Sequence, residues 1–64
     1  MMYLHNFLGV FPPSQSVLIY THDPRIAVYD GSIAKLRYVD VKRLVVVMAE
    51  YSMNQLLIKV HNNG

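Results

Sequence analysis

Residues 25–36 read RIAVYDGSIAKL, and the fold of this 64-residue chain depends on what happens at Asp30-Gly31 in the middle of that stretch. Asp-Gly between two apolar runs is the strongest short-range signal for a tight β-hairpin. The alternative is one strand over residues 26–36 that bulges or bends at Gly31. The local chemistry slightly favours the hairpin, so the choice depends on the rest of the chain.

Three other segments have the composition of strands. They are short runs rich in β-branched and aromatic residues, bounded by turn residues, and they span residues 16–21 (SVLIYT), 44–51 (LVVVMAEY) and 55–60 (QLLIKV). Apolar residues on both faces of 44–51 predict a central strand, or one that another copy covers. Asp23 before Pro24 predicts a turn after the first strand. The final HNNG is expected to be a frayed tail.

The N-terminal segment predicts a short helix or an irregular arm. Leu4, Phe7, Leu8 and Phe11 recur at spacings of three and four, which places them on one helical face. Pro12-Pro13 ends any such helix, because proline disfavours the helical conformation in the residue before it. We expect this apolar face to pack on the sheet, with Phe7 and Phe11 as packing residues.

These segments predict one α+β domain over residues 1–64 that is mostly β. It has a short N-terminal helix or arm and a strongly bent, four-stranded antiparallel sheet that forms a small barrel-like roll. Residues 37–43 form a turn or short helix before the third strand, with Asp40 capping it and Val41 pointing inward. Two antiparallel hairpins make up the sheet in this prediction.

Composition predicts a homo-oligomer. A chain this short buries only about 60% of its unfolded surface, so its core is marginal and needs support. No cysteine is present to form a disulfide, and His5, His22 and His61 lack the spacing of a zinc site. Apolar residues make up 53% of the chain and charged residues only 16%, which leaves apolar strand faces for a second copy to bury.

Several functional classes are disfavoured. The longest apolar run, residues 44–49, is far shorter than a membrane span, and the N-terminus lacks the features of a signal peptide. Without cysteine, a cytoplasmic protein with no membrane partner is the simplest expectation. Asp30 has no second carboxylate to form a general acid-base pair, and no serine has a nucleophile-elbow context. We therefore predict no enzyme activity, no catalytic residue, no metal and no cofactor.

Five segments carry a resemblance to known proteins: SVLIY (16–20), VYDG (28–31), IAKLRY (33–38), VKRLVVVMA (41–49) and LLIKV (56–60). Over residues 16–60 the chain resembles a broad group of short proteins of unassigned function encoded by bacteriophages and integrated elements, mainly of Gram-positive bacteria. The resemblance implies a phage accessory protein that acts by binding. It also implies that the chain runs through Gly31 as one bent strand, and this becomes our prediction.

Basic residues gather after that strand. Four of the six lie within nine positions, and two tyrosines lie among or just before them. Arginine and lysine donate hydrogen bonds to phosphate oxygens, and tyrosine can stack on a base. The predicted ligand-binding residues are Lys35, Arg37, Tyr38, Lys42, Arg43 and Tyr29. The alternative is a solvated rim in which Asp40 forms an ion pair with one of the basic residues.

We therefore predict a non-enzymatic phage anti-defence protein in the host cytoplasm. It would sequester a small phosphorylated, nucleotide-type ligand between the protomers of a homo-oligomer. The first alternative is a direct inhibitor of a host defence protein that presents an apolar strand face or edge. The second is a small barrel that binds nucleic acid, although a net charge of +2 is modest for that role.

Overall fold

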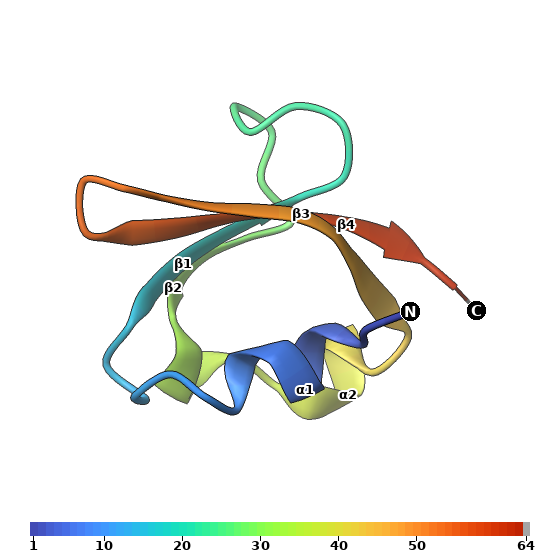
Figure 1. Ribbon diagram of the computed structural model, residues 1–64, viewed down its shortest axis with the longest axis horizontal. Coiled ribbons are helices and arrows are strands. Elements are labelled where there is room, and N and C mark those ends of the chain that lie inside the picture. The colour runs from blue at the N-terminus through green and yellow to red at the C-terminus, as the bar shows by residue number, and fades with distance from the viewer. Residues whose placement is uncertain (64) are drawn as a thin grey trace.

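The computed structural model describes residues 1–63 and consists of one open sheet with short helical segments on one face (Figure 1). The sheet has four strands in the order β2-β1-β4-β3. The elements along the chain are α1 (Leu4–Leu8), β1 (Ser16–Tyr20), β2 (Tyr29–Ser32), the 3₁₀-helix η1 (Ile33–Lys35), α2 (Tyr38–Val41), β3 (Leu44–Ser52) and β4 (Gln55–Asn62). The expected mostly-β α+β fold is therefore confirmed at this level.

Asp30 and Gly31 lie inside strand β2 and make no turn. They pair with Leu18 and Val17 of the antiparallel neighbour β1. The connection from β1 to β2 is the loop 21–28, in which the Ile26 N–H donates to the Asp23 carbonyl at 2.8 Å. The predicted turn at Asp23-Pro24 is confirmed, and the tight-hairpin alternative is wrong. Because the loop already reverses the chain, no second turn is needed at Asp30-Gly31.

The predicted long strand is right at Gly31 and wrong at both ends. Residues 26–28 belong to the loop, and the Ile26 and Val28 side chains are exposed. Beyond Ser32 the chain winds into η1, where the Leu36 N–H donates to the Ile33 carbonyl at 3.0 Å. Strand β2 is thus only four residues long.

The sheet is mixed, which corrects the prediction of a purely antiparallel one. The central strands β1 and β4 run parallel, with Ile19 beside Ile58, while β3 and β4 form an antiparallel hairpin. Met53 and Asn54 make its turn with φ of 52° and 64°. The sheet stays open, with β2 and β3 as its edges. Strand β4 continues to Asn62, so the tail predicted to fray from residue 61 is partly strand.

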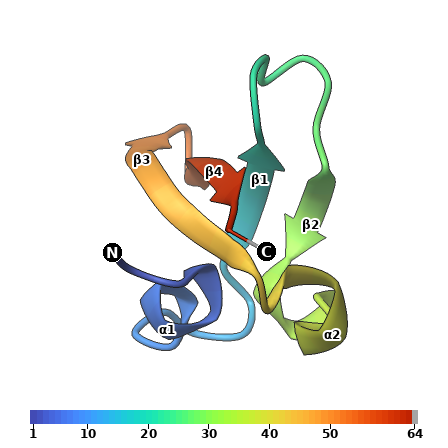
Figure 2. The same ribbon diagram turned by 90° about the vertical axis from the view of Figure 1, so that its right-hand side faces the viewer.

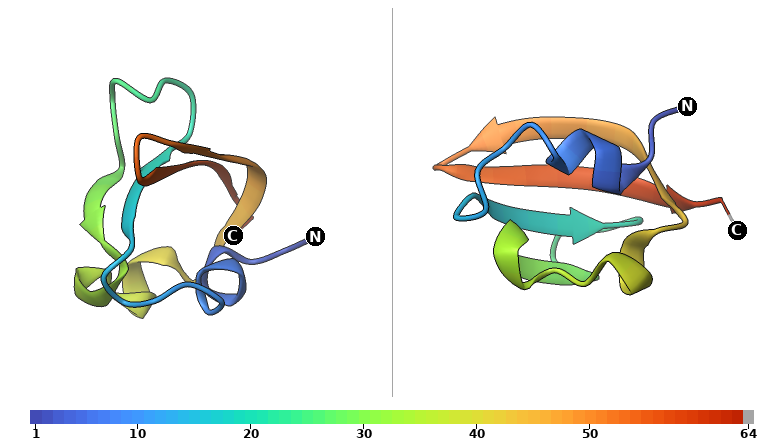
Figure 3. Two further views of the ribbon diagram at one scale, coloured as in Figure 1. Left: turned by 60° about the vertical axis from the view of Figure 1, so that its left-hand side comes forward. Right: turned by 90° about the horizontal axis from the view of Figure 1, so that it is seen from below.

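The helical segments cover one face of the sheet, and the core lies between the two layers (Figures 1 and 2). Seen from below, α1 and α2 lie across this face (Figure 3). The core side chains come from every major element except β2: Leu4, Leu8, Val17, Ile19, Val41, Leu44, Leu56, Ile58 and Val60. The inward position predicted for Val41 is confirmed, although no side-chain cap begins α2.

The N-terminal helix α1 owes its place to this core. Five residues are too few for a stable helix in water, and here Leu4 and Leu8, one turn apart, are buried against the sheet. Phe7 and Phe11 pack against the core with ring centroids 5.4 Å apart. The expected helix and the packing role of both phenylalanines are confirmed.

The face opposite the helices is partly covered by the loop 21–28, which rises above the sheet in Figure 1. Tyr20 is buried although it lies outside the main core cluster. Its neighbour across the parallel pair is Lys59, which is half-buried. No helix among residues 1–63 combines the length and apolarity needed to cross a membrane.

Candidate anion-binding groove

A groove of about 380 Å³ lies beside the edge strand β2 and contains three of the six predicted ligand-binding residues. The residues that line it come from the end of the loop, the start of β2, and the link between η1 and α2. They are Val28, Tyr29, Lys35, Leu36, Arg37, Asp40 and Val41. Two basic side chains and one carboxylate thus share a partly apolar groove.

Short helical turns fix the backbone positions of the two basic residues. Lys35 is the last residue of η1, and Arg37 is the N-cap residue of α2. Between them Leu36 packs against the core, which anchors the backbone of the link. Lys35 and Arg37 are both exposed, so they flank a fixed apolar residue with their charged ends in solvent.

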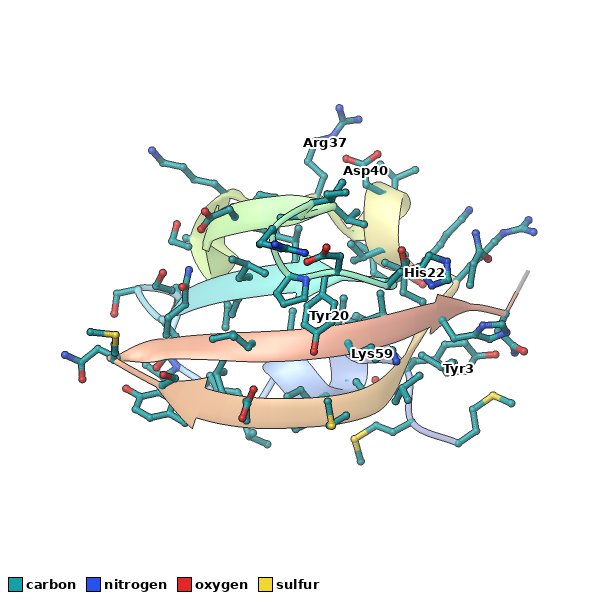
Figure 4. The ribbon with its side chains drawn as sticks, turned by 90° about the horizontal axis from the view of Figure 1, so that it is seen from above. Tyr3, Tyr20, His22, Arg37, Asp40 and Lys59 are labelled. Atoms are coloured by element: carbon teal, nitrogen blue, oxygen red, sulfur yellow. The ribbon has the colours of Figure 1, made fainter. Side chains whose placement is uncertain are left out.

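Asp40 is the acidic member of the groove. Its carboxylate lies 3.8 Å from the Arg37 guanidinium, and both side chains are largely exposed. Figure 4 shows the two side by side above α2. A pair this long and exposed contributes little to stability. The expected ion pair between Asp40 and one of the basic residues is confirmed. Lys35 makes no ion pair with any residue from 1 to 63.

Tyr29 forms one wall of the groove. Its hydroxyl donates to the Ser32 carbonyl at 2.6 Å, and its ring lies against Gly31. A Cβ at residue 31 would lie 2.9 Å from the Tyr29 hydroxyl oxygen, closer than such contacts allow, and 3.2 Å from Cζ, which is a tight contact. Every described glycine has a negative φ, so Gly31 is needed for its missing side chain and not for a turn conformation. Packing of the Tyr29 ring therefore explains the glycine of the Asp-Gly pair, and a turn does not.

Tyr38 belongs to a different cavity. Its ring meets the His5 ring edge-on, with centroids 4.9 Å apart, and both line an apolar cavity of about 180 Å³ between α1 and α2. The Nδ1 atom of His5 is buried there without a hydrogen-bond partner among the described residues. The Tyr38 ring therefore packs against His5, and Tyr38 does not line the groove that contains Lys35 and Arg37.

Lys42 and Arg43 also lie outside the groove. Both are exposed in the short connection between α2 and β3, and the Arg43 carbonyl accepts a hydrogen bond from the Asn63 N–H at 2.9 Å. The run of basic residues is thus divided by α2. The structure brings Tyr29, Lys35 and Arg37 together, and it leaves Tyr38, Lys42 and Arg43 elsewhere.

Sequence reasoning did not identify the apolar walls of the groove. Val28 and Leu36 are ordinary strand-forming residues in the sequence, and only the turn at η1 brings them to the same cavity. Asp30, for which no catalytic role is predicted, accepts a hydrogen bond from Gln55 Nε2 at 3.0 Å. Among residues 1–63 no three histidine or acidic side chains gather as they would to hold a metal ion.

Comparison with known proteins returned no matching family model, curated protein or solved structure.

Proposed function

We propose that this protein is a non-enzymatic binding protein that captures a small phosphorylated, nucleotide-type ligand in the groove beside β2. The observation that carries the proposal is the placement of Lys35 and Arg37 on either side of the packed Leu36, in a groove that Tyr29 also lines. Lysine and arginine suit phosphate oxygens, and the apolar wall suits a base or sugar. The groove volume lies within the usual range for small-molecule sites.

In the biological setting that we propose, a bacteriophage uses this capture to blunt a host defence signal in the cytoplasm. The setting rests on the resemblance of residues 16–60 to short phage proteins. The chemistry rests on the groove alone, so the two parts of the proposal are tested separately.

Binding is tested by isothermal titration calorimetry with a panel of cyclic and linear nucleotides. Arg37→Gln is expected to weaken binding of the tightest ligand about tenfold or more, since a charge-assisted hydrogen bond contributes roughly 1.5 to 3 kcal/mol. Arg25→Gln is the matched control, because it removes the same charge from an exposed loop position outside the groove. Equal losses in both variants, or no binding to any nucleotide, would refute capture at this groove.

Asp40→Asn is expected to change the ligand affinity in the opposite direction from Arg37→Gln. Asp40 is the carboxylate that an incoming phosphate must approach. Removing its charge is expected to strengthen binding about two- to fivefold, the equivalent of the 0.5 to 1 kcal/mol typical of exposed charge pairs. An unchanged affinity would show that the ligand binds away from Arg37.

We further propose that two copies pair along the open edge of β3. Val46 at its start is covered, because its N–H donates to the Met2 carbonyl at 2.8 Å. Beyond it, the exposed edge carries Val47, Met48 and Tyr51, each more than half exposed. An exposed strand edge with apolar side chains is a template for pairing with another strand.

The same edge supports the second candidate function, direct inhibition of a host defence protein by strand addition. Mass measured under native conditions separates the two. A dimer that retains a nucleotide supports capture. A monomer that forms a stoichiometric complex with one host protein, and loses it when Met48 is changed to lysine, supports inhibition.

A further inference from the structure

A second cavity, of about 480 Å³, lies at the carboxyl ends of the parallel strands β1 and β4. Because Tyr20 pairs with Lys59, the chain leaving β1 meets the last residues of β4 at one end of the sheet. In doubly wound α/β sheets, which consist mostly of parallel strands, ligands bind outside such carboxyl ends. The cavity is lined by Thr21, His22, Val47, Lys59, Val60, His61 and Asn62.

The lining offers hydrogen-bond donors and positive charge without a carboxylate. Thr21 has a hydroxyl, Lys59 an ammonium, and His22 and His61 each an imidazole N–H. In Figure 4, His22 and Lys59 lie on the same side of the sheet, well apart from Arg37 and Asp40. This cavity is therefore distinct from the groove beside β2, which contains Asp40.

Lys59 is the central observation. Its side chain is half-buried on the sheet, yet it makes no ion pair or hydrogen bond with any of residues 1–63. The Lys59 ammonium therefore has no counter-ion among the described residues, and its place in the cavity leaves it available to an anion from solution. An anion in the cavity would supply the missing partner, and the two imidazoles would complete its hydrogen bonding.

Other titratable groups surround the cavity without lining it. The two charges of the loop, Asp23 and Arg25, form an ion pair with each other at 3.0 Å. The remaining groups on the surrounding elements are Tyr20 of β1, Glu50 and Tyr51 of β3, Arg43 before β3, and Tyr3 and the α-amino group of Met1 in the arm that pairs with β3. None of these places a carboxylate in the lining.

We propose that this cavity binds a phosphate group or another dianionic oxyanion, held by Lys59 together with His22 and His61. The volume exceeds that of one inorganic ion, so the natural occupant is a phosphate monoester whose organic part fills the remaining space against Val47 and Val60. Binding is stronger when the imidazoles are protonated, because each then carries a positive charge. The site does not depend on the function proposed for the other groove.

Inorganic sulfate is the probe, because it stays dianionic at neutral and mildly acidic pH. The ring signals of the three histidines are followed by NMR at about pH 6 and pH 8 while sulfate replaces chloride at constant ionic strength. We expect saturable shifts for His22 and His61 and weaker binding at the higher pH. His5 lies on the opposite face, in the cavity beside Tyr38, and is an internal control whose signals stay fixed.

Lys59→Met keeps the apolar stem and removes the charge. It is expected to weaken sulfate binding about tenfold or more, as loss of a charge-assisted contact does. Lys42→Met is the matched control, since Lys42 is exposed and lines neither cavity. The His5 signals report that each variant is folded.

Fixed His22 and His61 signals, or equal shifts in wild type and Lys59→Met, would overturn the site. Equal affinity at both pH values would overturn the role of the imidazoles. The sulfate result does not depend on the nucleotide titration of Arg37→Gln. Failure of this site and failure of the groove beside β2 can therefore be distinguished. Phosphate monoesters of increasing size then distinguish binding of the ion alone from binding of a larger ligand.

Discussion

At the scale of the residue, Gly31 illustrates how one dipeptide carries two meanings. Asp-Gly commonly supplies a turn because glycine tolerates positive φ. Here the backbone is extended, and the absent side chain makes room for the Tyr29 ring. The hydroxyl of that ring is bound to Ser32, so the ring cannot move away without losing a hydrogen bond. The glycine at position 31 was informative in the sequence, but the reason for it is the ring of Tyr29, two residues earlier.

Gly31→Ala is expected to destabilise the protein by about 1–2 kcal/mol, because the new Cβ displaces a hydrogen-bonded ring. In a Tyr29→Ala background the same change should cost much less, since nothing then occupies the space. A double-mutant cycle from urea unfolding measures this coupling. Equal costs in both backgrounds would contradict the packing explanation.

Asp23 tests the electrostatics of the loop. Its carboxylate accepts hydrogen bonds from the Arg25 guanidinium at 3.0 and 3.2 Å and from the Arg25 backbone N–H at 2.9 Å. The guanidinium first, and the backbone N–H second, lower the pKa of Asp23 below its ordinary value of 3.8. The stability that this contact supplies is present above that ordinary value and is lost as the pH falls through the lowered pKa.

Arg25→Gln is therefore expected to raise the pKa of Asp23 towards its ordinary value, as followed by the carboxyl carbon signal in an NMR titration. The backbone N–H at residue 25 remains, so part of the depression should persist. A pKa unchanged by the substitution would mean that the backbone contact alone is responsible.

At the scale of the element, hydrophobic alternation located three of the four strands to within about two residues at each end. It failed for β2, because Ile26 and Val28 fit a strand pattern yet lie exposed in the loop. It also could not distinguish parallel from antiparallel pairing. Both arrangements bury the same inward residues of β1 and β4.

Ile58 tests the parallel pair, since it is fully buried beside Ile19. Ile58→Ala is expected to cost about 2–5 kcal/mol, a large share of the roughly 3–10 kcal/mol expected for a chain of this size. Leu57→Ala, the neighbouring change on the half-buried opposite face, should cost clearly less. Urea unfolding followed by circular dichroism measures both, and similar costs would mean that the face opposite the helices is also covered.

At the scale of the whole molecule, the apolar excess is only partly absorbed by one copy. The core contains nine buried residues, while several large apolar side chains stay exposed along β3 and in the loop. One sheet face packed by short helices cannot bury more. This leftover surface is why we propose that copies pair at the β3 edge.

Met48→Lys is expected to weaken such a dimer about tenfold or more, because a lysine on an edge strand opposes further pairing. Met53→Lys is the control, since Met53 is almost fully exposed in the turn beyond the edge. Light scattering during gel filtration measures the mass of each. A wild-type monomer, or a dimer that both variants preserve, would place the contact elsewhere.

The sequence by itself determined the positions of β1, β3 and β4, a short helix or arm at the N-terminus, and the inward place of Val41, because periodicity and turn chemistry act over a few residues. Tertiary structure alone decided the parallel β1–β4 pair, the reason for Gly31, and the separation of the basic run into Lys35 and Arg37 on one side of α2 and Lys42 and Arg43 on the other. It also brought His22 beside Lys59 and His61. His22 is far from the other two along the chain, and the parallel pairing of Tyr20 with Lys59 brings it to the same cavity.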